Sequence, residues 1–198
     1  MTDLRSEVTS LVKRSLQDPR GAARQIIDMN LSLPVLLNGV VLVVILSVLM
    51  TYGTVIMAGP DAIILQLTDS PMVFALFMVV QMVFLVVALL WTGKVIGGVG
   101  TIEAFAALLT WLQMLWLMVQ VVQTVLMLLL PSAAAMLGIA SLVFGLWILI
   151  QFIAEAHGFP NWIKAVGVLA MAFFGVIAGL SFLLSIIGIS TLGLTSNV

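Results

Sequence analysis

The chain of 198 residues has no cysteine and little charge. Without cysteine, disulfide bonds, thiolate metal sites and a cysteine nucleophile are excluded. Only 8% of the residues are charged, whereas 63% are hydrophobic and the mean hydropathy is +1.32. A soluble domain of this length needs more polar surface than such a composition supplies. The formal net charge of −1 gives no indication of a nucleic-acid partner.

Five long apolar runs contain no Asp, Glu, Lys, Arg or His. Proton-coupled and ion-coupled transporters usually keep an ionisable side chain in the membrane, because that group does the work. The sequence also lacks a pair of intramembrane aspartates and an H-E-x-x-H motif. We therefore expect neither a pump nor an enzyme, and neither a metal nor a cofactor.

Each run is long enough for a membrane-spanning helix, which needs ~20 apolar residues. The runs cover residues 35–57, 71–93, 104–130, 133–154 and 165–189, and proline or glycine punctuates the breaks between them. The predicted fold class is an all-α integral membrane protein with a five-helix bundle over residues 34–190. An N-terminal arm of residues 1–33 precedes the bundle, and a short tail of residues 191–198 follows it.

The basic residues predict the orientation. Those before the first run are Arg5, Lys13, Arg14, Arg20 and Arg24, and the other two are Lys94 and Lys164. With the N-terminus in the cytoplasm, all seven lie on the cytoplasmic side, as the positive-inside rule requires. The connection after the first run instead carries Asp61 and Asp69. We expect the C-terminus outside.

The arm has the pattern of amphipathic helices at a membrane surface. Leu4, Val8, Leu11 and Val12 recur at helical spacing, and the five arm basic residues are available to anionic lipid headgroups. Asp18-Pro19 reads as the cap and first turn of a second short helix. That helix would present Ala22, Ala23, Ile26 and Ile27 to the membrane. The alternative is a frayed polar tail.

A polar stripe runs along the third predicted span. It consists of Thr110, Gln113, Gln120, Gln123 and Thr124. An amide in hydrocarbon costs several kcal/mol when it is unpaired, so this face should meet protein or water. We expect interhelical hydrogen bonds, with Gln81, Gln151 and Asn38 as candidate partners. A polar conduit or ligand site and an oligomer contact are the alternatives.

Small residues line the last two predicted spans. Ala134, Gly138, Ser141 and Gly145 lie on one, and Gly167, Gly175, Ala178, Gly179, Ser181 and Ser185 on the other. Small faces let helices approach closely in a membrane. Packing within the chain is expected, with dimerisation as the alternative.

The only histidine, His157, stands beside glycine near a predicted membrane edge. Such a histidine is expected to be a solvated loop residue. As an alternative, the neighbouring Glu155 raises its pKa and forms a pH-responsive or metal-touching edge.

Three segments together resemble the Yip family of Ypt/Rab-interacting membrane proteins. They are D-P-R at 18–20, G-G-V-G-T-I-E-A-F from Gly97 to Phe105, and A-H-G-F-P-N-W-I-K-A from Ala156 to Ala165. The residues that carry the resemblance in the two longer segments are Gly97, Gly98, Gly100, Thr101, His157, Gly158, Lys164 and Ala165. The resemblance covers nearly the whole chain.

This resemblance implies a non-enzymatic membrane protein. Eukaryotic members act in traffic from the endoplasmic reticulum to the Golgi and bind prenylated small GTPases. They carry a long cytoplasmic region with an Asp-Leu-Tyr-Gly-Pro motif, which is missing from the roughly thirty residues before the first run here. We therefore do not carry Rab-type GTPase binding over. The short arm resembles the prokaryotic branch, which implies a bacterial inner membrane.

The expected function is a membrane scaffold, an organising protein or a partner-binding protein. Its expected partners are membrane lipids, a second copy of the chain or another membrane protein. An uncoupled transporter, a channel or a lipid-moving protein that uses the polar stripe is the alternative.

Overall fold

A computed structural model describes residues 2–58 and 70–186, and these residues form helices joined by short connections. The helices are α1 (Thr2–Gln17), α2 (Pro19–Asp28), α3 (Leu33–Ala58), α5 (Pro71–Val95), α6 (Ile102–Leu129), α7 (Pro131–Ala156) and α8 (Trp162–Ile186). The predicted tail and the last residues of the fifth predicted span lie outside the described residues.

Five of these helices, α3 and α5 to α8, are long and apolar enough to cross a membrane. The predicted fold class, a helical membrane bundle, is confirmed, and the chain is a multi-pass membrane protein. Four helices extend past the apolar runs to include a charged residue: Lys94 in α5, Glu103 in α6, Glu155 in α7 and Lys164 in α8. Their polar ends therefore extend beyond the apolar stretch.

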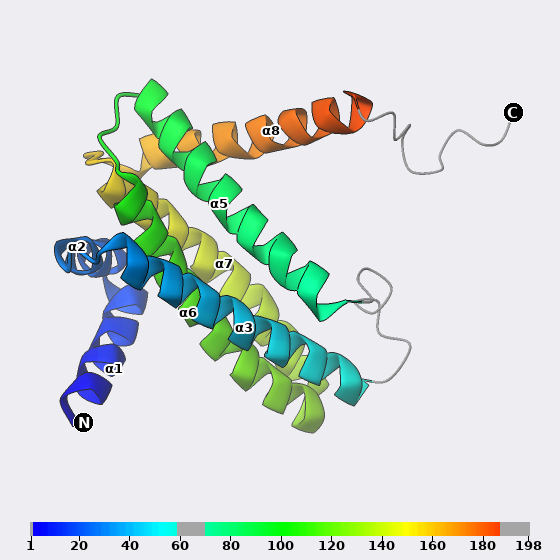
Figure 1. The fold of residues 1–198 in the computed structure, drawn as a ribbon. Coiled ribbons are helices and arrows are strands. Elements are labelled where there is room, and N and C mark those ends of the chain that lie inside the picture. Colours follow the sequence, from blue (N-terminus) through cyan, green and yellow to red (C-terminus); the bar gives the residue numbers. More distant parts are fainter. Residues whose placement is uncertain (1, 59–69, 187–198) are drawn as a thin grey trace, which may run out of the picture.

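Helices α3, α5, α6 and α7 run roughly together, whereas α8 crosses them and leads away from the bundle (Figure 1). The first half of α8 packs inward through Ala165, Val168 and Ala172. Further along, Phe173 and Phe174 are exposed. The middle of α8 thus presents large side chains to the surroundings, which in a membrane are lipid tails.

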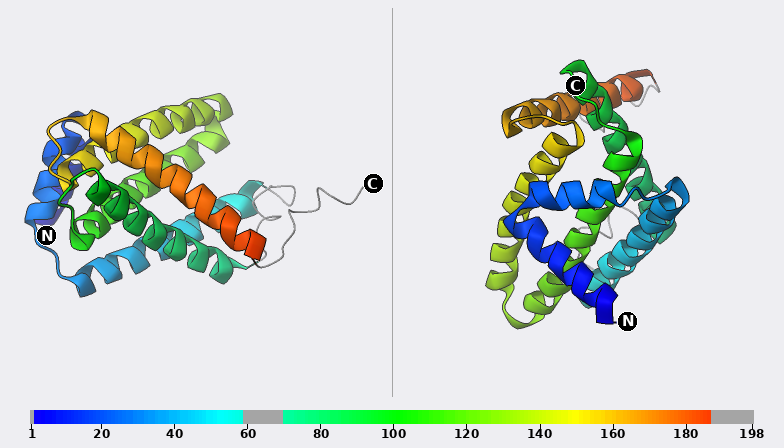
Figure 2. Two further views of the ribbon diagram at one scale, coloured as in Figure 1. Left: turned by 90° about the horizontal axis from the view of Figure 1, so that it is seen from above. Right: turned by 90° about the vertical axis from the view of Figure 1, so that its left-hand side faces the viewer.

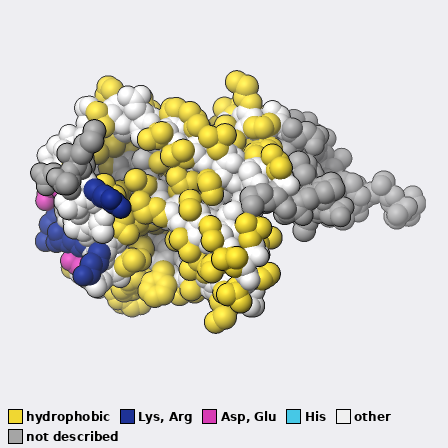
Figure 3. Space-filling view, turned by 90° about the horizontal axis from the view of Figure 1, so that it is seen from below, with side chains coloured by type: hydrophobic (Ala, Val, Ile, Leu, Met, Phe, Trp, Pro, Cys, Tyr) yellow, Lys and Arg dark blue, Asp and Glu magenta, His cyan; other side chains and the backbone are white. Residues whose placement is uncertain are grey.

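Arg20, Arg24, Lys94 and Lys164 lie at one end of the bundle, which we call the basic end. Figure 3 shows Lys and Arg gathered at this end, while hydrophobic side chains cover the body. The other end contains the α6–α7 turn at Leu130. A body this apolar is compatible with lipid and not with water.

Tryptophans on four of the long helices lie toward the basic end. A hydrocarbon layer of ~30 Å takes ~20 helical residues, and twenty residues counted back along α6 from Leu130 end at Trp111. In α5, twenty residues counted from Pro71 end next to Trp91, which is exposed. Trp147 and Trp162 are exposed near the same end. Tryptophan favours the boundary between hydrocarbon and headgroups.

The polar stripe of α6 joins α6 to its neighbours. Gln120 donates from Nε2 to the Thr51 hydroxyl of α3 at 3.1 Å, and the hydroxyls of Thr124 and Thr54 lie 3.2 Å apart. Gln123 donates to the Ala134 carbonyl of α7 at 3.4 Å. These contacts are the interhelical hydrogen bonds expected of the stripe.

The expected partners of the stripe were wrong. Asn38 and Gln81 are exposed, and Gln151 is buried far along α7 from Gln120 and Gln123. The amides bond instead to threonine hydroxyls and a main-chain carbonyl, because these groups face α6 at the same depth. Of the remaining stripe residues, Thr110 donates to its own helix at Ala106 and Gln113 is half-buried.

The small face of α7 packs on α6. A side chain added at Gly145 would meet Trp116 at 2.7 Å, and one at Gly138 would meet Gln123 at 2.9 Å. On α8, an added side chain at Gly175 or Gly179 would meet nothing within 4 Å. Packing within the chain therefore explains the small residues of α7 but not these two glycines of α8.

We predict that Gln120→Leu lowers the melting temperature of the protein in detergent, because it breaks the bond to Thr51. The expected loss is ~1 kcal/mol, as is typical of hydrogen bonds between membrane helices. Gln81→Leu is the matched control, since Gln81 is exposed on α5 and its replacement should leave the melting temperature unchanged. Equal melting temperatures for the two variants would contradict a structural role for Gln120.

Candidate functional site

Three segments of the chain meet at the basic end. Helix α2 lies across this end, beside the α5–α6 connection at 96–101 and the α7–α8 connection at 157–161 (Figure 2). These are the segments with the D-P-R, Gly-Gly and His-Gly motifs. Residues separated by more than 130 positions therefore form one site.

Helix α5 ends in a glycine turn. Gly97 has a φ of +91°, which L side chains rarely adopt. The Gly98 N–H donates to the Gly93 carbonyl at 2.8 Å, and the Gly97 N–H donates to the Lys94 carbonyl at 3.0 Å. This is a Schellman motif, which satisfies the last carbonyls of the helix and reverses the chain.

Helix α7 ends in the same way. Gly158 has a φ of +68°. The Phe159 N–H donates to the Ala154 carbonyl at 2.8 Å, and the Gly158 N–H donates to the Glu155 carbonyl at 3.0 Å. The Val99 N–H also donates to the His157 carbonyl at 3.2 Å, so the two turns are joined by a main-chain hydrogen bond.

His157 occupies the centre of the site and is only 2% exposed. Its Nδ1 accepts from the Gly100 N–H at 3.2 Å, and its Nε2 lies 3.1 Å from the Leu89 carbonyl. A carbonyl can only accept, so Nε2 carries the proton and the ring is neutral. Burial lowers the pKa of His157 below its ordinary value, which favours the same state.

Both expectations for His157 were wrong. The side chain is not solvated, and Glu155 binds arginines rather than the imidazole. The error has a physical reason: the helix end at Gly158 turns the chain back over the bundle, which covers the ring. The lowered pKa also opposes the pH response that a neighbouring carboxylate was expected to give.

Three glycines leave room for the imidazole. A Cβ atom would lie 1.7 Å from Nε2 at Gly93, 2.5 Å from Nδ1 at Gly98 and 2.7 Å from Nδ1 at Gly100. The Phe105 and Phe159 rings pack around it at centroid distances of 4.9 and 5.2 Å. The Gly-Gly motif and the His-Gly motif are therefore two halves of one contact.

The other motif residues support this contact. Thr101 caps α6, because its Oγ1 accepts from the Ala104 N–H at 3.2 Å. Lys164 lies with Nζ 5.7 Å above the centre of the Phe159 ring, and Ala165 is fully buried.

Helix α2 docks on this end through a paired ion contact. One carboxylate oxygen of Glu155 accepts a hydrogen bond from Arg20 Nε at 3.0 Å. The other accepts one from Arg24 Nε at 2.8 Å. Arg20 also donates to the carbonyls of Phe159 and Pro160, the latter at 3.2 Å. These two carbonyls lie in the α7–α8 connection, so Arg20 joins α2 both to α7 and to that connection.

The apolar face of α2 contacts protein. Ala22, Ala23 and Ile26 are buried against the bundle, so the expectation that they face the membrane was wrong. Arg20 and Arg24 bind Glu155, and their expected contact with headgroups stays a prediction. The predicted cap of α2 is present, since Asp18 accepts from the Gly21 N–H at 2.9 Å.

Helix α1 is also held by the bundle. Its Ser15 is buried and accepts from Trp111 Nε1 at 2.9 Å, and its Leu11 joins the core. The alternative of a frayed tail was therefore wrong. Arg14 bonds Gln25 at 2.9 Å, whereas Arg5 and Lys13 are exposed.

The site is built to hold helices together. Within the described residues, no group of three or more His, Asp and Glu side chains is placed to hold a metal ion. In that same part of the chain, no buried side-chain nitrogen or oxygen lacks a hydrogen-bond partner. Both imidazole nitrogens are occupied, so His157 offers neither a ligand nor a base.

Comparison with protein families agrees with this geometry. A model described as the Yip1 domain matches residues 13–193. The chain belongs to the Yip1 domain family. The match includes α2 and both glycine turns, so the residues that meet at His157 lie inside the Yip1 domain. Yip1 proteins are membrane proteins that are not known as enzymes. Searches of curated proteins and of solved structures found no match.

We predict that Gly93→Ala destabilises the Yip1 domain strongly, because its Cβ would overlap the imidazole at 1.7 Å. The expected loss is ~3 kcal/mol, at the upper end for overpacking. Gly53→Ala is the matched control on α3, where an added Cβ meets nothing within 4 Å. It should leave the melting temperature unchanged or raise it, since alanine favours helix by ~0.5–1 kcal/mol. A Gly93→Ala protein as stable as Gly53→Ala would contradict the packing around His157.

Proposed function

We propose that this Yip1 protein is a non-enzymatic membrane-organising protein whose working part is helix α1. The observation that carries the proposal is the paired contact of Arg20 and Arg24 with Glu155. This contact fixes α2 to the end of α7, and α2 in turn fixes the position of α1.

The depth of α1 relative to the bilayer supports this proposal. Ser15 of α1 bonds to Trp111, the residue at which a hydrocarbon layer measured from Leu130 ends. Helix α1 therefore lies at the height of the headgroups. It exposes Lys13 and Leu16 side by side, one suited to an anionic headgroup and the other to the upper acyl chain.

An interfacial helix held in one leaflet acts on membrane shape. Helices α1 and α2 enlarge the area that the protein occupies in the leaflet at the basic end. They do not enlarge it in the other leaflet, so one leaflet expands relative to the other. The rigid link to the bundle keeps α1 from leaving the surface. We infer that the protein organises the membrane around it or presents α1 to a second copy or another membrane protein.

We also propose that the basic end faces the cytoplasm, as the positive-inside rule requires. The chain has no cysteine, so single substitutions give clean labels. In intact cells, an impermeant thiol reagent should label Ser132→Cys, at the exposed start of α7, and not Ser10→Cys. After permeabilisation both should react. The reverse pattern in intact cells would overturn the orientation.

The proposed function predicts that the protein reduces the diameter of vesicles into which it is reconstituted. Glu155→Gln should weaken this effect, because it removes the charge that holds Arg20 and Arg24. Glu103→Gln is the matched control, an exposed glutamate at the same end of the bundle. Vesicle diameters from electron cryomicroscopy provide the measurement, in lipid mixtures with one-third anionic lipid. Equal diameters with and without the wild-type protein would contradict the proposal.

One observation favours an alternative function. A cavity of about 420 Å³ is lined by Thr51, Thr54, Gln120, Gln123 and Thr124 among others. It lies toward the end opposite the basic one and offers hydroxyls and amides without charge. An uncoupled transporter, channel or lipid-moving protein would use this cavity. Solute leakage or lipid scrambling by the wild-type protein, abolished in Gln120→Leu, would favour it.

A further inference from the structure

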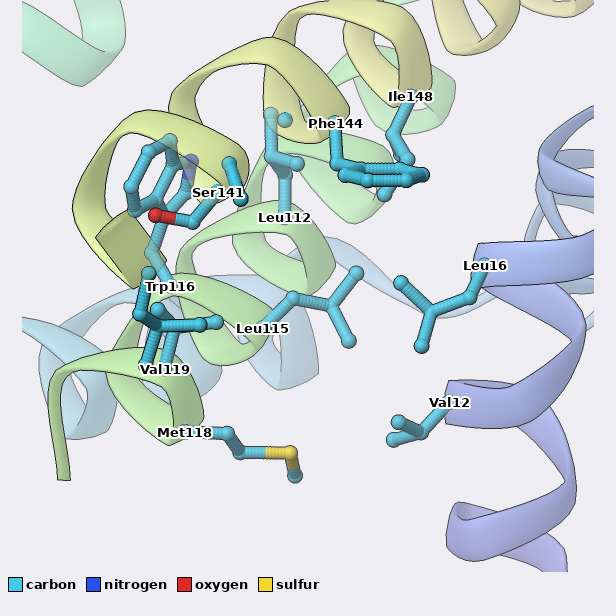
Figure 4. Close-up of a pocket in the computed structure, with 13 residues that line it drawn as sticks. Val12, Leu16, Leu112, Leu115, Trp116, Met118, Val119, Ser141, Phe144 and Ile148 are labelled. Atoms are coloured by element: carbon cyan, nitrogen blue, oxygen red, sulfur yellow. The ribbon is translucent and has the colours of Figure 1, made fainter. Parts of the chain in front are cut away.

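An apolar groove lies between α1 and the α6–α7 pair. Figure 4 shows Val12 and Leu16 of α1 facing Leu115 and Met118 of α6 across an open space. The groove has a volume of about 340 Å³, and its lining is almost wholly apolar. It continues along α7 past Phe144.

The groove begins at the membrane boundary and leads inward. On α6 it begins at Leu112, next to the Trp111 that bonds to Ser15. Along α6 it extends to Val119, eight residues or ~12 Å deeper than Trp111. The groove is open to its surroundings, and atoms that fill it would gain dispersion contacts with its lining. Within a bilayer, the material available to fill it is an acyl chain.

An acyl chain gains no hydrophobic free energy by moving from the bilayer into the groove, because both surroundings are apolar. The headgroup must therefore decide which lipid stays. Two basic residues of α1 lie on or just before the turns that line the groove. Arg5 lies seven residues before Val12, and Lys13 lies three before Leu16, so each shares a helix face with a lining residue. Both are exposed.

We propose that this groove is a binding site for one anionic phospholipid. One acyl chain lies between α1 and the α6–α7 pair, and the phosphate-containing headgroup lies beside Lys13 and Arg5. The proposal deepens the proposed function and rests on it, since it requires α1 at the level of the headgroups.

The charge of the site selects the lipid. A basic residue near a headgroup contributes a factor of about five in affinity for an anionic lipid. With Lys13 and Arg5 together, the protein should prefer phosphatidylglycerol to phosphatidylcholine of the same chain length by about tenfold or more. High salt should reduce this preference, because it screens the exposed charges.

Native mass spectrometry of the full-length protein in a neutral detergent tests the site. The probes are phosphatidylglycerol, phosphatidylcholine with the same chains, and glycerol phosphate, which has no chain. The expected result is one tightly retained phosphatidylglycerol, weaker retention of phosphatidylcholine and no retention of glycerol phosphate. Retention of glycerol phosphate, or equal retention of the two lipids, would overturn the proposal.

Two substitutions separate the headgroup from the chain. Lys13→Gln should reduce the preference for phosphatidylglycerol about fivefold. Ala140→Trp, at an exposed position of α7 that lines the groove, should reduce retention of both lipids. Ala170→Trp is its matched control, at an exposed position of α8 outside the groove, and should behave as the wild type. Lipid retention by Ala140→Trp equal to that of Ala170→Trp would refute the site.

The same spectra and the vesicle assay distinguish the remaining outcomes. A wild-type dimer that Ala140→Trp dissociates would identify the groove as a contact between two copies and overturn the lipid site. A protein that shrinks vesicles without selecting phosphatidylglycerol would overturn this inference and leave the proposed function. A protein that selects phosphatidylglycerol without shrinking vesicles would support this lipid site and the position of α1 on which it rests, and would overturn the proposed effect on membrane shape.

Discussion

The basic end of this Yip1 domain depends on one neutral imidazole. His157 connects the end of α5 through Leu89, the start of α6 through Gly100 and its own helix α7. A charged imidazolium could not accept from the Gly100 N–H, so the connection exists only in the neutral state. Once α5, α6 and α7 are joined, Glu155 has a fixed position two residues before His157. The arm can then bind to it through two arginines.

The sequence allowed much of the fold to be predicted, because its signals are local. Long charge-free runs predicted the spans, and the Asp18-Pro19 pair predicted the start of α2. Partners that depend on depth and direction were not predictable in this way. The α6 glutamines bond to Thr51 and to the Ala134 carbonyl, and neither is marked by any pattern in the sequence. Main-chain carbonyls are identical along the chain, so only the fold shows which of them faces an amide.

For the arm, too, the sequence predicted the helices but not their partners at the candidate site. Alanines and isoleucines at helical spacing indicate an apolar face, but lipid and protein satisfy such a face equally well. A signal that favours protein was present: Ala22 and Ala23 are small, and small residues suit close helix packing more than lipid contact. Gly93 is the last residue of the second predicted span, and α5 continues past it to Val95. Its conformation is ordinary, and its lack of a side chain is explained only by the histidine opposite.

The packing of glycines against His157 also restricts how this site can change during evolution. Any side chain at Gly93 overlaps the ring, so glycine must persist for as long as the histidine does. Replacing the histidine first leaves a hollow lined by three glycines and an unpaired Gly100 N–H. Neither order of single substitutions passes through a well-packed intermediate. In related sequences, His157 and Gly93 should therefore be inherited as a pair and lost as a pair.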